Sequence, residues 1–342
     1  MTALGLTVVL GLMLAPAAAA RAKAPADDPL VKRQLHLDRS GVDARRSWAT
    51  TRGGPVVVAV IDSGVDLGHP DLAANAWTNS REVAANGVDD DANGRVDDVH
   101  GWDFFGQDAD PGDENGHGTH VAGVLAARGR NGIGVSGVAQ KAQIMALRVL
   151  GADNRGAPGN VAAALRYAVA NGARVVNVSL TTARPAPALD AAIAEADAAG
   201  VLVVVSAGNE HTDLDATPSY PACSTSPNVV AVAATTRSGA LAEFSNFGAS
   251  CVDLAAPGED ILATHAGGGY KTRSGTSAAT AQVSGAAVLL LAARPTLNVA
   301  QLRGALVNTA IAPAAASRGT AATAGRIRLS VTRALRFALR AR

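Results

Sequence analysis

Three residues of the sequence have the side chains that nucleophilic catalysis requires: an acid, an imidazole and a hydroxyl. Asp62 directly follows the apolar run Val56 to Ile61. His117 lies among small residues in the segment Asn115 to Gly123, and Ser277 directly precedes an apolar stretch. A hydroxyl becomes a good nucleophile when an imidazole accepts its proton and a carboxylate orients that imidazole. The chemistry that these residue types could perform is therefore acyl transfer.

Each of these residues also has an ordinary structural explanation. A lone Asp at a strand end is often a cap, a lone His is often a hydrogen-bonded structural residue, and a Ser before a helix is usually an N-cap. Together, in the order Asp62, His117, Ser277 along the chain, they are hard to explain by structure alone. The combination favours a catalytic set, provided that the fold brings the three side chains together.

Continuous apolar runs predict the elements that must position these residues. Runs without alternation are typical of parallel strands that are covered on both faces. The predicted strands are Val56 to Ile61, Ile144 to Val149, Val175 to Leu180, Val201 to Ser206, Val229 to Ala234 and Val252 to Ala256. Predicted helices lie between them, including Val161 to Ala170 with Asn160 as N-cap, and Ala186 to Ala199, which Gly200 ends. This alternation predicts an α/β fold with a doubly wound, mostly parallel sheet and helices on both faces.

The composition is that of one globular domain. The chain has 342 residues, of which 48% are hydrophobic, so it can bury a sizeable core. A net charge of +1 gives no reason to expect a nucleic-acid partner. Without an internal repeat or a long linker, we expect residues 46–342 to form a single domain and a monomer.

Near the C-terminus, Val331, Leu335 and Leu339 share one helical face, and docking of this face on the domain is favoured over membrane binding.

The N-terminus has the features of an export signal. Residues 1–20 contain the apolar run Leu4 to Leu14 followed by small residues, which predicts a signal peptide and a secreted protein. A buried apolar helix is the alternative, and the run is too short to span a bilayer.

Cys223 and Cys251 are the only cysteines. In an exported chain, this number favours one disulfide over two unpaired buried thiols.

Four blocks of the sequence resemble the subtilisin-like (subtilase) family of serine proteases. They are Val60 to Leu72 (VIDSGVDLGHPDL), His117 to Gly123 (HGTHVAG), Val203 to Glu210 (VVVSAGNE) and Gly275 to Gly285 (GTSAATAQVSG). The resemblance runs from about Asp28 to about Phe337, and the chain order of acid, imidazole and hydroxyl also matches that of subtilisin. It implies an endopeptidase in which Ser277 attacks the scissile carbonyl, His117 is the base and Asp62 orients the imidazole.

The same resemblance implies how a substrate is held. Asn209 corresponds to the family's side-chain donor to the developing oxyanion, with the backbone N–H of Ser277 as its partner. An extended polypeptide would lie between two backbone edges, Gly151 to Gly156 and Ser179 to Thr182. The expected binding residues are Gly151, Gly156, Ser179, Leu180, Thr181 and Gly208. The family usually has two glycines after the Ser-Leu pair, so the two threonines at 181 and 182 predict a narrower pocket.

The block around Ser277 departs from the family at three positions. Subtilases usually have Met, Pro and His where this chain has Ala278, Ala281 and Gln282. These residues support the geometry, and a small misplacement of a nucleophile costs about 10²-fold in rate. Two hypotheses follow: an active endopeptidase, and a subtilase fold that binds peptides without turnover.

Residues 21–45 are also too few for the family's folding prodomain, so we expect an N-terminal segment without a full prodomain.

Two segments carry the oxygen ligands that calcium prefers. Residues 89–98 begin with D-x-D-x-N-G, the opening of an EF-hand loop, although His100 stands where the closing Glu belongs. The expected ligands are Asp89, Asp91, Asn93 and Asp97. Asp71 and Asn131 resemble a second calcium site of the family. Structural calcium is therefore expected, with a solvated acidic loop as the alternative for residues 89–98.

Two further motifs are rejected because of their context. The segment Gly132 to Gly137 fits the G-x-G-x-x-G dinucleotide motif, but it follows a predicted helix where the motif requires a strand. The triplet Asn177-Val178-Ser179 is a formal glycosylation sequon within a predicted core strand. Neither motif therefore contributes to the predicted function.

Overall fold

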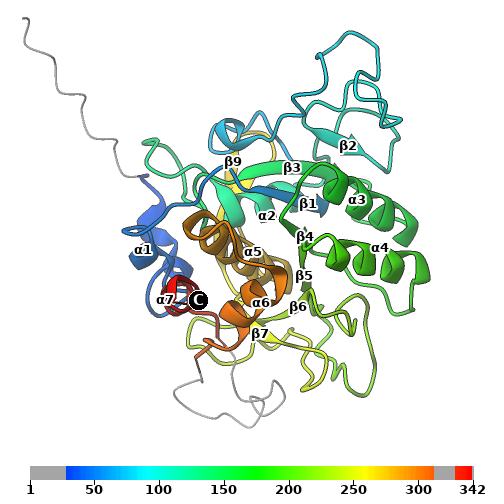
Figure 1. The fold of residues 1–342 in the computed structure, drawn as a ribbon. Helices are drawn as coiled ribbons and strands as arrows, with labels where there is room; N and C mark the ends of the chain where they lie inside the picture. The colour runs from blue at the N-terminus through cyan, green and yellow to red at the C-terminus, as the bar shows by residue number, and fades with distance from the viewer. Residues whose placement is uncertain (1–27, 312–327, 341–342) are drawn as a thin grey trace, which may run out of the picture.

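A seven-stranded parallel sheet forms the centre of the molecule (Figure 1). The computed structural model describes residues 28–311 and 328–340, so the predicted signal peptide, residues 1–20, lies outside the described residues. The strands follow the order β2-β3-β1-β4-β5-β6-β7, with every neighbouring pair parallel. Their bounds are β1 Val57–Asp62, β2 Gly101–Asp103, β3 Gln143–Arg148, β4 Val175–Val178, β5 Leu202–Ser206, β6 Val229–Thr235 and β7 Leu254–Pro257. An antiparallel pair, β8 Ile261–His265 and β9 Gly269–Arg273, lies apart from this sheet.

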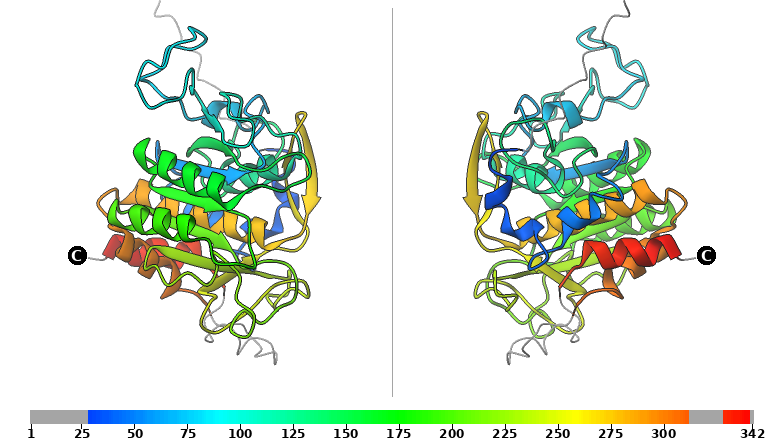
Figure 2. Two further views of the ribbon diagram at one scale, coloured as in Figure 1. Left: turned by 90° about the vertical axis from the view of Figure 1, so that its right-hand side faces the viewer. Right: turned by 90° about the vertical axis from the view of Figure 1, so that its left-hand side faces the viewer.

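Helices cover both faces of the sheet, as predicted (Figure 2). Their bounds are α1 Ala44–Ser47, α2 His117–Ala126, α3 Pro158–Ala170, α4 Pro187–Ala198, α5 Thr276–Ala293, α6 Val299–Val307 and α7 Val331–Arg340. Alternate residues of β1 face opposite layers: Val58 and Val60 pack with α2 and α5, and Ala59 and Ile61 pack with α3 and α4. The predicted doubly wound α/β fold is therefore confirmed.

Several predicted boundaries shift by a few residues, each for a local reason. Helix α3 begins at Pro158 with Ala157 at the N-cap position, so the predicted cap Asn160 lies inside the first turn. Proline suits the first helical position because its backbone needs no N–H there and its φ is already helical. Ser277 lies within the first turn of α5 rather than before it. The predicted strand Val175 to Leu180 ends two residues early, because β4 stops at Val178 and both Ser179 and Leu180 lie beyond the sheet.

Helix α5 passes through the centre of the domain. By length and composition alone it is apolar enough to cross a membrane, but 83% of it is buried inside the protein. It packs beneath β4, β5 and β6 and against α2. Its apolar residues are therefore explained by the core, and it is the only such helix among the described residues.

The two ends of the described chain pack on each other, with residues 28–47 (blue) beside α7 (red) in Figure 1. The Val331 N–H donates to the Val42 carbonyl oxygen at 2.8 Å. Helix α7 buries Val331 and Leu335, but Leu339 is 49% exposed, so the predicted face was wrong at that position. The buried stripe instead runs through Ala334 and Ala338, because the 3.6-residue repeat turns position 339 away from the core.

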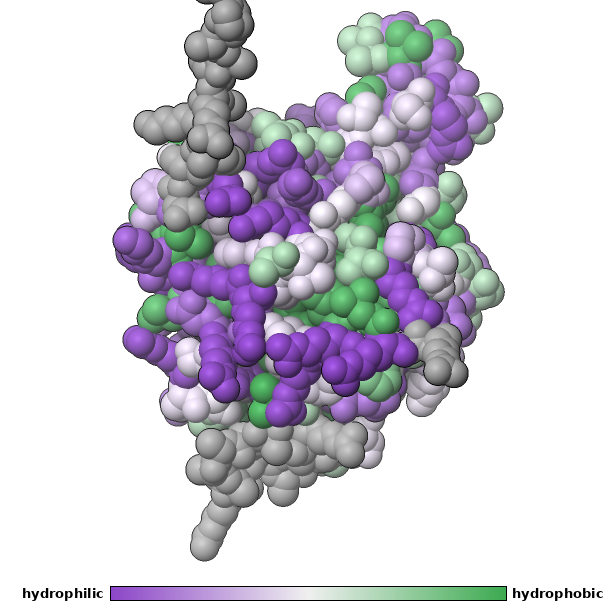
Figure 3. Space-filling model, turned by 60° about the vertical axis from the view of Figure 1, so that its left-hand side comes forward, coloured by the Kyte–Doolittle hydropathy of each residue, from purple (hydrophilic) through white to green (hydrophobic). Residues whose placement is uncertain are grey.

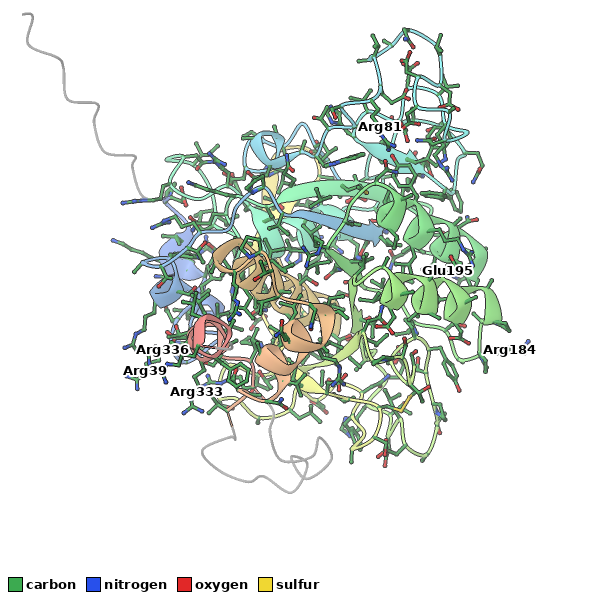
Figure 4. All side chains as sticks on the ribbon, in the orientation of Figure 1. Arg39, Arg81, Arg184, Glu195, Arg333 and Arg336 are labelled. Atoms are coloured by element: carbon green, nitrogen blue, oxygen red, sulfur yellow. A yellow bond between two sulfur atoms is a disulfide. The ribbon has the colours of Figure 1, made fainter. Side chains whose placement is uncertain are left out.

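The surface on this side of the molecule is mostly hydrophilic. In the space-filling view of Figure 3 the hydrophilic side chains predominate, and apolar residues gather in recesses between them. Arg39, Arg333 and Arg336 project outward beside α7 (Figure 4). Helix α7 therefore docks on the domain, as the sequence analysis favoured.

A disulfide joins Cys223 to Cys251, as predicted from the number of cysteines. Cys223 belongs to the loop that follows β5, and Cys251 directly precedes the segment that leads into β7. Both sulfur atoms lie near the Leu214 carbonyl oxygen. The bond therefore links two loops that emerge beside the neighbouring strands β6 and β7.

Candidate active site

Asp62 and His117 meet at the carboxyl edge of the sheet. Asp62 ends β1 and is fully buried, and His117 begins α2. The His117 Nδ1 atom lies 2.6 Å from Asp62 Oδ1, which also accepts the Ser63 N–H at 2.7 Å. Gly118 permits this approach, because a Cβ there would lie 2.0 Å from the Gly64 carbonyl oxygen. With Nδ1 engaged by the carboxylate, Nε2 is the ring atom available to exchange a proton with a third group.

The pKa of His117 is raised above its ordinary value. Burial has the largest effect and lowers this pKa, but the negative charge of Asp62 and the hydrogen bond to it outweigh burial. Arg273 lowers the pKa and Asp113 raises it, both to a smaller extent. The protein therefore stabilises the imidazolium that forms when His117 accepts a proton.

Ser277 and Asn209 line the same cavity as His117. Ser277 is in the first turn of α5, and Asn209 follows the end of β5. The Asn209 Oδ1 atom accepts two hydrogen bonds from Thr276, one from its N–H at 2.9 Å and one from its hydroxyl at 3.1 Å. Because the amide oxygen is occupied in this way, the amide nitrogen is the end of Asn209 that can donate to a ligand. A base, a hydroxyl and an amide donor thus surround one space.

This cavity has a volume of about 480 Å³ and extends over the ends of β3, β4 and β5. Its wall includes most of the predicted binding residues, namely Gly156, Ser179, Leu180, Thr181 and Gly208. Gly151 is not among them. It is buried beneath the loop, where a Cβ would lie 2.8 Å from the Phe105 ring. The two predicted edges therefore do face one cavity, with Gly151 supporting one of them from below.

Sequence reasoning missed several residues of the cavity wall. They come from the loop after β5 (Tyr220), from α4 (Leu189) and from the predicted edge itself (Arg155). Tyr220 pairs with Thr182 through both backbone groups, each hydrogen bond being 2.8 Å. Thr182 is thus already paired, which leaves Ser179 to Thr181 as the open edge. Arg155 lies within the predicted edge and could have been found, whereas nothing local in the sequence marks Tyr220.

The three unusual residues after Ser277 are buried in α5. The Gln282 side-chain nitrogen donates to the Pro257 carbonyl oxygen and to that of Ala278. This bond ties α5 to the end of β7, and hence helps to set where the first turn of the helix lies. Ala281 is fully buried beside it. The chain thus has its own support for Ser277 at these positions.

The acidic loop between β1 and β2 projects from the body of the molecule (Figure 1). Carboxylate oxygens of Glu82, Asp91 and Asp98 lie within 4.8 Å of one another. The buried Oδ1 atom of Asn93 has no hydrogen-bond partner in the part of the chain that the structure describes. Asp91 also forms an ion pair with Arg81 at 3.0 Å, and each of the three carboxylates accepts hydrogen bonds. Carboxylate and amide oxygens gathered in this way are ligands of the kind that calcium prefers.

Two of the predicted calcium ligands accept backbone hydrogen bonds within this loop. The carboxylates of Asp89 and Asp97 accept backbone N–H groups, those of Asn93 and Gly94 for Asp89, and those of Asn86 and Gly87 for Asp97. Asp89 and Asp91 both accept the Asn93 N–H, so the structure brings these three residues together, as the pattern D-x-D-x-N-G suggested. The carboxylates that lie within 4.8 Å of that of Asp91 are those of Glu82 and Asp98, which the sequence motif does not single out.

At the second predicted metal site, the Asp71 carboxylate accepts hydrogen bonds from three groups. Asn131 donates its side-chain N–H to Asp71 Oδ1 at 2.7 Å, and the Val135 N–H donates to Asp71 Oδ2 at 2.9 Å. The Tyr270 hydroxyl is hydrogen-bonded to the same carboxylate, and burial together with Asp71 raises the pKa of Tyr270. Asp71 and Asn131 therefore lie together, as predicted, and are joined by a direct hydrogen bond.

The two rejected motifs are structural. Residues 132–137 form a loop between α2 and β3, with no strand before them and no helix after them. Asn177 is fully buried in β4, where its side chain is hydrogen-bonded to Ser179 and Ser284. Neither the dinucleotide motif nor the sequon therefore has the setting that its function requires.

Comparison with proteins of known sequence bears on what this site does. Subtilisin BL from Lederbergia lenta is 40% identical over 258 residues, which cover 75% of this chain and 84% of that protein. Thermitase from Thermoactinomyces vulgaris is 37% identical over 269 residues, which cover 79% of this chain and 86% of that protein. Both alignments extend over most of each chain.

Solved structures and a family model agree with these relatives. A crystal structure of a cold-adapted subtilisin-like serine proteinase matches with a TM-score of 0.66 and 35% identity, covering 82% of this chain and 90% of that chain. A protease structure from Pseudoalteromonas arctica matches with a TM-score of 0.78 and 28% identity, covering 92% and 100%. The model of the subtilase family matches residues 53–330, a range that contains the whole cavity. The chain therefore belongs to the subtilase family and is a subtilisin-like serine endopeptidase.

Proposed function

We propose that the protein is a secreted endopeptidase that hydrolyses polypeptides through an acyl-enzyme, with Asp62, His117 and Ser277 as its catalytic triad. The observation that carries this proposal is the 2.6 Å hydrogen bond between His117 and Asp62 at the wall of a cavity that Ser277 also lines. Reaction with a fluorophosphonate tests it. An isolated serine hydroxyl does not react rapidly with such a reagent near neutral pH, so labelling of Ser277 requires a positioned base.

In this mechanism the Ser277 Oγ atom attacks the scissile carbonyl carbon while His117 Nε2 takes its proton. His117 then gives that proton to the leaving amine, which departs and leaves the acyl group on Ser277. Water attacks the ester by the same route, and the proton returns to Ser277. Asp62 keeps the imidazole in the tautomer with hydrogen on Nδ1, and its charge stabilises the imidazolium at each transfer.

Negative charge develops on the carbonyl oxygen during both attacks. In this proposal, the Asn209 amide nitrogen and the Ser277 N–H donate to that oxygen, because both groups lie at the cavity. The N–H of Ser277 is in the first turn of α5, where backbone N–H groups have no partner within the helix. A preorganised donor in a site shielded from water stabilises the transition state more than the ground state.

Replacement of Asn209 by alanine is expected to lower kcat by about 10²- to 10³-fold, the range that this change has in subtilisin. KM should change little, because the oxyanion forms only after binding. Steady-state kinetics on a fluorogenic peptide measure both constants, and a thermal melt checks that the loss of two hydrogen bonds to Thr276 has left the fold intact. An unchanged kcat would remove Asn209 from the mechanism.

The substrate in this proposal is an extended polypeptide held between the 151–156 loop and Ser179 to Thr181. Backbone groups of an extended chain pair with such edges whatever the side chains are. Ser179, Leu180, Thr181 and Gly208 line the cavity between these edges and His117. The threonine side chain at 181 occupies space that a glycine would leave open, so we expect it to restrict the side chains that the pocket accepts.

Secretion is supported by the disulfide and by the apolar run near the N-terminus. Disulfides persist in oxidising compartments outside the cytosol, and the Cys223–Cys251 bond closes two surface loops. An apolar run within residues 1–20 has the pattern of a signal peptide. We therefore assign residues 1–20 to export.

Calcium in this proposal binds in the acidic loop, held by Glu82, Asp91, Asn93 and Asp98. The ion would neutralise carboxylates that otherwise repel one another, and so would stabilise the loop without taking part in the chemistry. Tyr167 donates its hydroxyl to Asp98 at 2.6 Å, which connects this loop to α3. The site would thus stabilise the face of the sheet that carries the 151–156 edge.

Removal of calcium is expected to lower the melting temperature. A ligand at a hundred times its Kd stabilises the native state by about 2.7 kcal/mol, and this contribution disappears with chelation. Melting curves with calcium and with excess chelator measure the difference. In Asp98→Asn the difference should shrink, whereas it should persist in Asp153→Asn, which removes an exposed carboxylate outside the loop. Equal melting temperatures of the wild-type protein with and without chelator would contradict the calcium site.

A further inference from the structure

The cavity that contains Ser277 has an unbalanced charge. Among the described residues that line it, Arg155 alone has a permanent charge, and none is an aspartate or a glutamate. The remaining wall is formed by apolar, hydroxyl, amide and glycine residues together with His117. A substrate side chain that enters beside Arg155 therefore meets a positive group with no carboxylate on the same wall.

Arg155 holds its place through its backbone, and its side chain is not needed for the fold. The Arg155 N–H donates to Asp153 Oδ1 at 3.1 Å, and its carbonyl oxygen accepts the Gly151 N–H at 3.0 Å. These bonds close the turn that forms the edge. The guanidinium itself makes no ion pair or hydrogen bond within the described residues, and the residue is exposed.

The carboxylates nearest in sequence to the site are engaged elsewhere. Glu114, three residues before His117, pairs with Arg148 at 2.7 Å. Glu210, next to Asn209, accepts hydrogen bonds from the Asn209 N–H and from Asn246. One carboxylate oxygen of Asp153 accepts the backbone N–H of Arg155. None of them neutralises the Arg155 guanidinium by an ion pair.

Arg155 and the two proposed reacting side chains of the cavity come from different elements. The residue belongs to the turn between β3 and α3, whereas Ser277 is in α5 and His117 in α2. Gly156 keeps this turn close to the sheet, because a Cβ there would lie 2.0 Å from the Val149 carbonyl oxygen. A flexible arginine side chain on this edge can reach a substrate side chain without touching the reacting atoms.

We propose that Arg155 is a specificity-determining residue that selects polypeptides with an aspartate or glutamate side chain at one position beside the 151–156 edge. The inference rests on the proposed function, since it concerns the substrate of the same cavity. A guanidinium binds a carboxylate through two parallel hydrogen bonds and through the attraction of opposite charges. A glutamine side chain at the same position of the substrate has no charge, so it lacks this attraction. The effect is limited because the pair is exposed to water.

Pairs of internally quenched peptides that differ only by Glu or Gln at a single position test this proposal. At low salt, the wild-type protein should cleave the Glu peptide with a kcat/KM about two- to fivefold higher at one position, the range of an exposed ion pair. The preference should decline in 1 M salt, where the screening length is about 3 Å. Arg155→Gln should abolish it, and Arg155→Glu should reverse it in favour of a Lys peptide.

Arg184→Gln is the matched control. Arg184 is exposed, does not line the cavity and projects away from the body of the molecule (Figure 4), so its loss should leave the Glu preference unchanged. The absence of a Glu preference at every position, or its persistence in Arg155→Gln, would overturn the inference.

A second measurement separates this inference from the proposed function. If the wild-type protein cleaves none of the peptides, the proposed function fails. The inference about Arg155 is then tested by the Kd values of the same Glu and Gln peptides, measured by fluorescence anisotropy. A tighter Kd for the Glu peptide that depends on Arg155 would support it without any turnover. Equal Kd values for the two peptides would contradict it.

Discussion

Replacement of Ser277 by alanine is expected to lower kcat by about 10⁶-fold, the loss that removal of the nucleophile causes in subtilisin. The same variant should no longer react with a fluorophosphonate, because the atom that forms the covalent bond is gone. Mass spectrometry of the labelled wild-type protein should find the probe on Ser277 alone. Ser277 lies in the first turn of α5, partly exposed, so its replacement removes only a hydroxyl group and should leave the fold intact.

Ser274→Ala is a matched control, because Ser274 is an exposed serine that lies three residues before Ser277 and outside the cavity lining. This variant should keep both labelling and hydrolysis. Wild-type protein that is folded and calcium-loaded, yet neither labels nor cleaves an unfolded protein, would contradict the proposed mechanism. Peptide binding without turnover would then be the better description, with Ala278, Ala281 and Gln282 as the residues that displaced the nucleophile.

Replacement of Asp62 by asparagine is expected to lower kcat by about 10⁴-fold at neutral pH. An asparagine side chain keeps the size of Asp62 but removes the charge that stabilises the His117 imidazolium, and it favours the wrong tautomer. Asp62 is fully buried, and His117 Nδ1 lies 2.6 Å from it, so no water can readily replace the carboxylate. Steady-state kinetics at pH 7 measure this loss.

The pH dependence of kcat/KM gives an independent measure of the same interaction. His117 acts as a base only when it is neutral, so activity falls as the pH decreases through its pKa, which the protein raises above the ordinary value. In Asp62→Asn the charge of Asp62 and its hydrogen bond, the two largest effects that raise this pKa, are lost while burial, which lowers the pKa, remains. The acidic limb of the residual activity should therefore move to lower pH. Asp113→Asn should move it in the same direction by less, and an unmoved limb in Asp62→Asn would contradict this account.

Much of the framework followed from local sequence. The apolar runs Val56 to Ile61 and Val201 to Ser206 predicted buried parallel strands, because a strand that is covered on both faces needs no polar face. The end of the first predicted strand then identified Asp62, since polar side chains that end such runs emerge at one edge of the sheet. Asn209 was identified by its resemblance to the side-chain donor of the subtilase family. His117 and Ser277 were identified by the blocks in which they stand.

The pairing of Cys223 with Cys251 also required little beyond the sequence, because two cysteines allow only one intramolecular bond. Short elements were harder to predict. Strand β2 has only the residues Gly101–Asp103, and β8 and β9 pair with each other away from the main sheet. Such segments have no long apolar run, and they form because neighbouring backbone groups supply their hydrogen bonds.

The acidic cluster of the proposed calcium site and the cavity wall depended on the tertiary structure. Asp91 matched the loop pattern, whereas Glu82 and Asp98, whose carboxylate oxygens lie within 4.8 Å of that of Asp91, are not ligand positions of that pattern. Tyr220 reaches the cavity because its backbone pairs with Thr182, which is 38 residues earlier in the chain. The sequence determined which residue types were available and which strands would be buried. Which side chains meet was decided only by packing, because contacts between distant segments depend on the whole fold.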